Sequence, residues 1–186
     1  MSANNFKKEV ITASLKDIKV ELDEEFDRNF QRKAFFTSAW TKKKYDDGKG
    51  SLLVRSGALR RSLSSVISGD RLVYSSSVPY AALHNEGGEI TVTEKMKRFF
   101  WYKYSLQASR YGYKKDGTRR NDKRNARLSE EAGFYKAMAL KKVGDKIKIP
   151  QRRFIGDSPE VQQAIRTIVE QNIQEFFTRF TNELKR

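Results

Sequence analysis

The sequence predicts an α+β fold in which long N- and C-terminal helices cover a small, mainly antiparallel sheet. Both ends of the 186-residue chain carry apolar residues at helical spacing, and the middle contains short β-prone runs bounded by glycine or proline. These strands are clustered between helices and do not alternate regularly with them, which favours α+β. At this length we expect a single domain over residues 1–186, carrying an insertion at residues 94–142.

The N-terminal helix is predicted over residues 5–32, and the helical pattern could continue towards Trp40. Its apolar residues recur every three or four positions and share one face: Ile11, Leu15, Ile18, Leu22, Phe26 and Phe30. Acidic residues between 21 and 27 occupy the other faces, where a solvated surface explains them better than a calcium site. Residues 41–51 are polar and contain glycine, which predicts a mobile loop.

A short helix and a β-hairpin are predicted next. Ser56 is placed to cap a helical turn that carries Leu59. Two β-prone runs follow, residues 63–68 and 71–76, and the Gly69-Asp70 pair between them predicts a tight turn.

A helical turn and a third strand follow the hairpin. The turn is predicted over residues 79–84, beginning at a proline and ended by the glycine pair 87–88. Ile90 and Val92 alternate with polar residues, which is typical of a brief strand.

The insertion is predicted to be largely helical and basic. Residues 94–110 carry aromatic side chains at helical spacing, whereas residues 111–127 contain few apolar side chains and predict a loop or a disordered segment. Residues 128–142 return to a helical pattern, with Ser129 as the expected cap and Gly144 beyond the end.

The chain ends with a strand and a long helix. Residues 146–150 alternate strictly and stop at proline, as an edge strand does. Asp157 and Glu160 occupy capping-box positions, and Pro159 lies in the first turn of the last helix. That helix is expected to reach about Leu184 and to bury one side: Val161, Ile165, Ile168, Phe176 and Phe180.

The net charge of +15 is concentrated in the insertion. Between Lys95 and Arg127 there are twelve Lys or Arg and only two Asp, so this segment alone carries +10. Cations beside aromatic rings are typical of a surface that binds phosphates and stacks bases. The alternative is a helix with packed aromatics followed by a solvated basic loop. The candidate contacts to nucleic acid or an acidic partner are Arg110, Lys114, Lys115, Arg119, Arg120, Lys123, Arg124 and Arg127.

Composition argues against catalysis. The chain has no cysteine and a single histidine, His84, which excludes thiolate chemistry and sites built from several histidines. No nucleophile elbow, HExxH pattern or phosphate-binding glycine fingerprint is present. We therefore expect no enzyme, no cofactor and no bound metal. No apolar stretch is long enough to cross a membrane, and the first residues do not resemble a secretory signal.

Three segments in order form a recognisable pattern. They read L-x-x-S-G-x-L-x-x-S at residues 53–62, Y-A-x-x-H-x-x-G at 80–87, and I-P-x-R-x-F-I-G at 149–156. Together with the helices that flank them, they resemble the phage virion morphogenesis family, the tail-completion proteins of the Mu and P2 type. The motif positions, expected to determine the fold, are Ser56, Gly57, Leu59, Tyr80, His84, Gly87, Pro150, Phe154 and Gly156.

The resemblance implies a structural virion protein that forms a ring, expected to be hexameric, at the neck or tail end. Such a ring completes the tail and allows head–tail joining after assembly in the host cytoplasm. Its partners are other copies of the chain, neighbouring neck, connector or tail proteins, and DNA that passes through the lumen. Arg152 and Arg153 are the expected interface residues, where a guanidinium reaches a carboxylate on the next subunit.

The resemblance does not explain residues 94–142, and a second function stays open. The alternative is a nucleic-acid-binding protein that uses the basic insertion, residues 95–127. A third class, a metal-dependent nuclease, requires a carboxylate site that the sequence does not contain.

Overall fold

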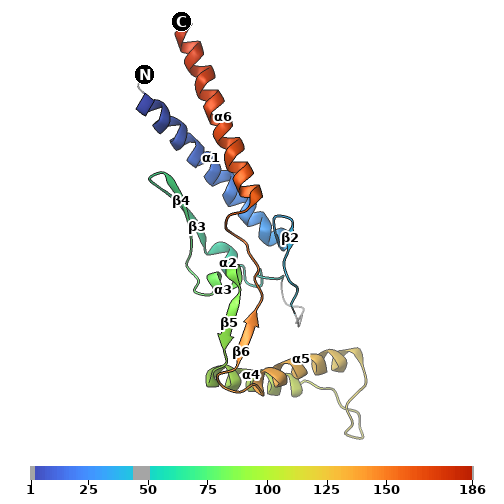
Figure 1. Ribbon diagram of the computed structural model, residues 1–186. Coiled ribbons are helices and arrows are strands. Elements are labelled where there is room, and N and C mark those ends of the chain that lie inside the picture. The colour runs from blue at the N-terminus through green and yellow to red at the C-terminus, as the bar shows by residue number, and fades with distance from the viewer. Residues whose placement is uncertain (1–2, 44–50, 186) are drawn as a thin grey trace. The chain divides into compact units, whose positions relative to one another are not determined.

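A computed structural model describes residues 3–43 and 51–185, which form two compact units (Figure 1). Of these residues, 3–41, 51–86 and 151–185 form the first unit, and 42–43 and 87–150 form the second. Helices and antiparallel ladders make up both, which confirms the α+β class. Most of the loop predicted at 41–51 lies outside the described residues.

The sequence led us to expect one small sheet, but the described strands do not join into one. They form three separate two-stranded antiparallel ladders. The strands are β1 (Ala34–Phe35), β2 (Ser38–Ala39), β3 (Leu63–Ser68), β4 (Arg71–Ser76), β5 (Gly88–Thr91) and β6 (Lys146–Ile149). Each strand pairs with a single partner, β1 with β2, β3 with β4 and β5 with β6. The β1–β2 and β3–β4 ladders are supported by packing against α1 (Ala3–Arg32).

Two long helices form the frame of the first unit. Helices α1 (Ala3–Arg32) and α6 (Pro159–Leu184) lie side by side and run antiparallel (Figure 1). Leu22 and Phe26 of α1 pack in one apolar cluster with Val161 of α6. The predicted apolar side of α6 is confirmed, because Val161 and Phe176 are buried and the other three residues are partly buried.

Helix α1 ends at Arg32 and does not continue towards Trp40. Lys33 and Phe36 adopt left-handed backbone conformations, with φ of 58° and 50°, which an α-helix cannot contain. The reversal produces the β1–β2 ladder and returns Phe35 and Trp40 to the core. Tertiary burial of these aromatic side chains therefore overrides the helical pattern of the sequence.

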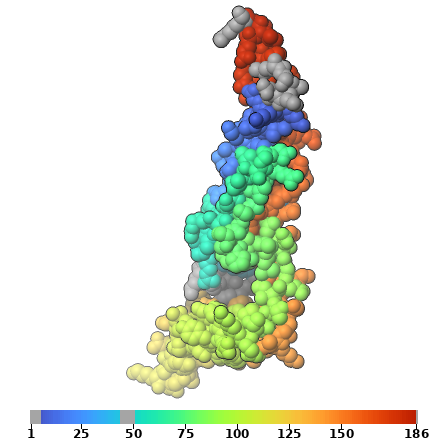
Figure 2. All heavy atoms as spheres, turned by 90° about the vertical axis from the view of Figure 1, so that its left-hand side faces the viewer, coloured from blue at the N-terminus to red at the C-terminus, as the bar shows by residue number. Residues whose placement is uncertain are grey.

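The β3–β4 hairpin has the predicted bounds and lies along α1 (Figure 2). Gly69 in its turn has a φ of 63°, the left-handed region that glycine enters without strain. Asp23 of α1 accepts hydrogen bonds from the Tyr74 hydroxyl at 2.9 Å, the Ser65 hydroxyl at 2.8 Å and the Lys19 ammonium at 2.6 Å. One carboxylate thus attaches the hairpin to the helix.

Replacing Asp23 with Asn is expected to make stability less dependent on acid pH. Partial burial raises the pKa of Asp23, but the three hydrogen bonds outweigh it and hold the pKa below the usual 3.8. A lowered pKa gives stabilisation that is present above pH 3.8 and is lost as pH falls through the folded value. Urea unfolding should show Asp23→Asn to be about 1 kcal/mol less stable at pH 7, with the difference shrinking as pH falls below 3.8. Glu21→Gln, an exposed change on α1, is the control, and a constant difference across pH contradicts the prediction.

The second unit is a helical hairpin built on a two-stranded ladder. Helices α4 (Glu94–Ala108) and α5 (Lys123–Ala139) pack together, and β5 pairs with β6. The strand predicted at 90–92 and the strand predicted at 146–150 are therefore partners.

Two long helices begin with a different N-cap residue from the predicted one, because the backbone conformation decides which residue can cap a helix. Helix α5 begins at Lys123, so the last five residues of the predicted loop are helical and Asp122, not Ser129, is the cap. The cap of α6 is Ser158, which accepts from the Val161 amide at 3.3 Å, and not Asp157. Only residues in extended conformation before the first turn can accept these amides.

Candidate functional site

The three sequence motifs meet around Phe154. The first motif contributes α2 (Ala58–Arg61), the second contributes α3 (Ala81–Glu86), and the third supplies the irregular segment 151–157. The Phe154 side chain is 0% exposed and packs with Phe30 of α1, whose ring centroid is 5.2 Å away, and with Leu59. We call this region of the first unit the motif junction.

Hydrogen bonds from side chains hold the backbone of the third motif. The Asn85 carbonyl oxygen accepts from the amides of Phe154 and Ile155 at 3.0 and 3.2 Å, and the Asn29 amide donates to the Phe154 carbonyl at 3.1 Å. The Trp40 indole donates to the Arg153 carbonyl at 2.5 Å. Buried backbone groups outside helices and strands must find hydrogen-bond partners in this way.

Asn29, Trp40 and Asn85 are junction residues that the sequence reasoning did not single out. Asn29 is 0% exposed, and its carbonyl oxygen also accepts from the Phe36 amide at 2.9 Å. An asparagine between Phe26 and Phe30, on the apolar face of an amphipathic helix, is the signal that could have identified it. Asn85 lies inside the second motif, directly after His84.

The other motif positions either pack in or near the core or adopt backbone conformations that favour glycine. Leu59 is buried, the Tyr80 ring contacts the His84 ring edge-on at 5.9 Å, and Gly57 has a φ of 70° at the N-cap of α2. The N-cap of α2 is therefore Gly57 and not Ser56 as predicted, although the Ser56 hydroxyl accepts from the Ala58 amide at 3.3 Å. Gly156 also has a positive φ, of 134°.

Gly87 and Pro150 lie beside the strand ends of the second unit. Gly87 has a φ of 77° between α3 and β5, and Pro150 follows β6. The positive φ of Gly87 and the place of Pro150 at a strand end agree with the expectation that both residues determine the fold, and that expectation stays a prediction.

Arg152 is a buried cation at the motif junction. Its side chain is 8% exposed and its Nε donates to the Thr41 carbonyl at 2.9 Å, while its backbone amide donates to the His84 carbonyl at 2.8 Å. No carboxylate of residues 3–43 or 51–185 forms an ion pair with it. Burial lowers the pKa of Arg152, because the interior solvates its charge poorly.

Arg153, the other predicted interface residue, is exposed. Its guanidinium donates to the Asp157 carbonyl at 3.1 Å and lies 5.3 Å from the centre of the Phe35 ring. This cation therefore also lacks a carboxylate partner within the described part of the chain.

The surroundings of His84 favour its neutral form. Burial lowers its pKa below 6.5, and the charge of Arg152 lowers it further. Its Nδ1 is buried and has no hydrogen-bond partner among the described residues. The motif junction thus contains two polar groups that each lack one kind of partner in the described part of the chain. Among these residues, the His84 Nδ1 has no hydrogen-bond partner and the Arg152 guanidinium has no carboxylate partner.

The predicted basic loop of the second unit is ordered. Residues 109–122 connect the end of α4 to the start of α5 (Figure 1), and Tyr113 and Arg119 form an isolated antiparallel β-bridge within them. Buried Asn125 donates to the carbonyls of Gly112 and Arg120 at 2.8 and 2.7 Å and accepts from the Gly112 amide at 2.9 Å. The expectation of a loop is thus right, but one asparagine gives it a defined shape.

Replacing Asn125 with Asp is expected to release this loop. The change keeps size and the acceptor but removes both donations, leaving the carbonyls of Gly112 and Arg120 opposite a carboxylate. Limited trypsin digestion should cleave between Lys114 and Arg124 at least tenfold faster than in wild type. Asn121→Asp, the same change at an exposed neighbour, should leave the rate unaltered. Equal rates for both variants contradict the role of Asn125.

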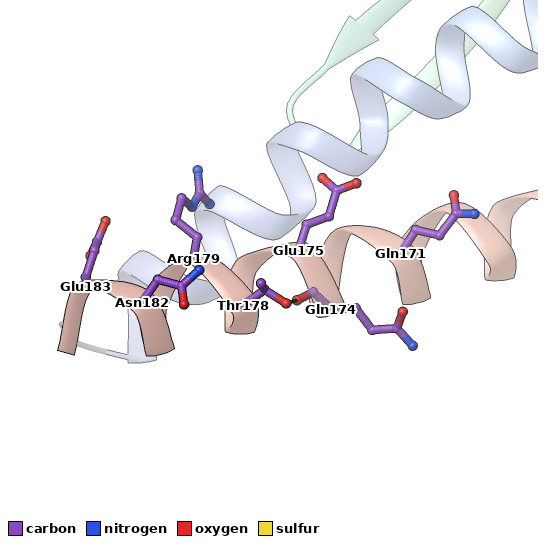
Figure 3. Close-up of a pocket in the computed structure, with 7 residues that line it drawn as sticks. All are labelled: Gln171, Gln174, Glu175, Thr178, Arg179, Asn182 and Glu183. Carbon is purple, nitrogen blue, oxygen red and sulfur yellow. Dashed lines mark hydrogen bonds between the residues drawn. The ribbon is translucent and has the colours of Figure 1, made fainter. Parts of the chain in front are cut away.

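One hollow on the surface of α6 is shallow and lined by polar side chains. Figure 3 shows that its lining side chains all come from one helix, from Gln171 to Glu183, and do not converge on a point. Arg179 points towards α1, where it pairs with Glu9. Across the described residues, no group of three or more acidic or histidine side chains could hold a metal ion. No helix in that part of the chain is long and apolar enough to span a membrane.

Comparison with known families identifies one family whose model matches this chain. A model of the phage virion morphogenesis family matches residues 29–174, a range that contains all three motifs and the basic insertion. No curated protein and no solved structure matches the chain. Because the family match covers most of the sequence, the chain belongs to the phage virion morphogenesis family and has a structural or assembly role in a phage virion.

Proposed function

We propose that the protein forms a closed ring at the neck or tail end of the virion, completes the tail and allows it to join the head. It acts by binding, without catalysis. Family membership supports the assembly role, and the three motifs that resemble tail-completion proteins fold into one junction.

The observation that carries the ring is the buried charge of Arg152. A guanidinium that is 8% exposed and lacks a carboxylate among the described residues is costly to desolvate. A carboxylate from the next copy of the chain would offset that cost. A hydrogen-bonded ion pair that becomes fully buried on assembly also fixes the register between subunits.

The ring is tested by measuring the mass of the particle that the protein forms. Light scattering and negative-stain images should show a closed ring, expected to be hexameric. Arg152→Met keeps the volume and removes the charge, so the subunit should stay folded while each interface loses about 2 kcal/mol or more. Dissociation should then occur at protein concentrations at least thirtyfold higher than in wild type.

Arg166→Met provides the matched control, because Arg166 is exposed on α6. This variant should assemble like wild type. A protein that stays monomeric at all concentrations, and that neither binds tail tubes nor restores head–tail joining to tails lacking it, contradicts the proposal. A folded Arg152→Met variant that assembles normally removes Arg152 from the interface.

A further inference from the structure

The second unit carries a dense group of exposed cations at one end. Residues 111–122 project beyond the α4–α5 pair (Figure 2) and connect to the first turns of α5. Eight exposed basic residues lie here, and we call them the basic tip: Arg110, Lys114, Lys115, Arg119, Arg120, Lys123, Arg124 and Arg127.

The two acidic residues of this segment are engaged locally. Asp116 accepts from the Thr118 amide at 2.9 Å and from its hydroxyl at 2.6 Å, which closes the turn. Asp122 accepts from the Asn125 amide at 2.7 Å and caps α5. Both carboxylates stabilise the backbone that presents the cations, and the tip keeps a strong positive charge.

The tip is also pre-organised. Asn125 links the start and the end of the loop, and the Lys114 amide donates to the Thr118 carbonyl at 2.8 Å. The Arg119 guanidinium lies 4.0 Å from the centre of the Tyr111 ring. Ordered cations lose less conformational entropy on binding a polyanion than cations on a flexible loop.

Helix α4 adds an exposed face on which cations and aromatic rings share one side. Lys95, Arg98, Phe99 and Tyr102 follow the i, i+3, i+4, i+7 spacing, and all four are exposed; we call them the α4 outer face. Phe99 and Tyr102 are 51% and 63% exposed. Phe100, in contrast, lies 6.4 Å from Tyr135 of α5 and belongs to the packing between the helices.

We propose that the basic tip and the α4 outer face form a binding surface for DNA. The tip contacts the phosphodiester backbone, and Phe99 and Tyr102 stack on bases or pack on sugars. A run of acidic side chains could neutralise the tip, but it offers no flat π surface for two exposed rings. An anionic membrane is less suitable because this face contains no aliphatic side chain to insert.

The test measures binding of the full-length protein to two labelled probes, a 30-base single strand and a 30-base-pair duplex, from 50 to 200 mM salt. Affinity should fall steeply as salt rises. Lys114→Gln/Lys115→Gln/Lys123→Gln should reduce affinity at least tenfold and lower the slope against log salt by about 2 to 3. Lys7→Gln/Lys8→Gln/Lys16→Gln, the same loss of charge on exposed positions of α1, should change neither quantity appreciably.

The stacking contribution has a separate test. Phe99→Ala/Tyr102→Ala should weaken single-strand binding about tenfold without changing the salt slope. A stronger effect on the single strand than on the duplex assigns the rings to bases, and an equal effect assigns them to the sugar–phosphate backbone. No effect on either probe overturns the role of the α4 outer face.

Other outcomes overturn the DNA surface as a whole. The first is that the tip variant and the α1 variant lose the same affinity for DNA. The second is that the protein binds polyglutamate or anionic vesicles as tightly as DNA and that this binding also depends on the basic tip. Ring formation is scored separately by particle mass, so failure of DNA binding leaves the proposed ring untouched.

Discussion

Replacing Phe154 with Ala is expected to lower the free energy of unfolding of the first unit by about 3–5 kcal/mol. The Phe154 ring is fully buried between elements that come from all three motifs, and its contacts include Phe30 and Leu59. Removing it leaves a cavity that the surrounding backbone cannot fill, because Asn85 and Asn29 hold the segment in place. Urea unfolding followed by circular dichroism measures the loss.

Phe177→Ala provides the comparison, because this phenylalanine of α6 is largely exposed. Its replacement should lower stability by about 1 kcal/mol or less. Similar losses at the two positions contradict the central place of Phe154 in the core. The loss at Phe154 should also abolish assembly, since the junction that holds Arg152 depends on the same packing.

Replacing Asn29 with Leu is expected to lower the free energy of unfolding by about 2–5 kcal/mol, although leucine is nearly the same size. The change leaves two backbone groups without partners, the buried Phe154 carbonyl and the partly buried Phe36 amide. Each unsatisfied group carries a desolvation penalty of about 1–3 kcal/mol. The added hydrophobic surface cannot offset both, so thermal and urea unfolding should agree on a large loss.

The same substitution at exposed Asn182 of α6 serves as the reference and should alter stability by about 0.5 kcal/mol or less. If Asn29→Leu is as stable as wild type, the buried amide is not needed and the junction is held by apolar packing alone. If the variant is stable but assembles more slowly, the role of Asn29 is instead to hold the third motif so that Arg152 is correctly positioned.

Elements specified by local patterns were predicted with accurate bounds. The hairpin at residues 63–68 and 71–76 agrees to the residue, because alternation and a glycine turn act over a few positions. The apolar side of α6 was likewise predicted, since its period is a property of the segment itself.

Elements that depend on distant partners were missed or misplaced. The turn after α1 requires left-handed conformations at Lys33 and Phe36, which only burial of Phe35 and Trp40 explains. The earlier start of α5 was missed for a different reason, because its cap Asp122 acts locally but residues 123–127 contain few apolar side chains and so predicted a loop. The shape of the loop before it depends on Asn125, which bonds Gly112 thirteen residues away. The hydrogen-bond partners of single polar residues cannot be predicted from the spacing of apolar residues.

For the candidate site, the sequence by itself determined the fold class, the three motifs and the concentration of charge between Lys95 and Arg127. These features follow from composition and short-range spacing, which tertiary packing does not alter. Only the tertiary structure decided that the motifs meet around Phe154, that Arg152 is buried without a carboxylate among the described residues, and that an ordered loop presents the basic tip. Burial and charge pairing depend on neighbours far away in the chain, and the order of the loop depends on hydrogen bonds of Asn125 to Gly112 and Arg120, which a pattern of apolar residues does not record.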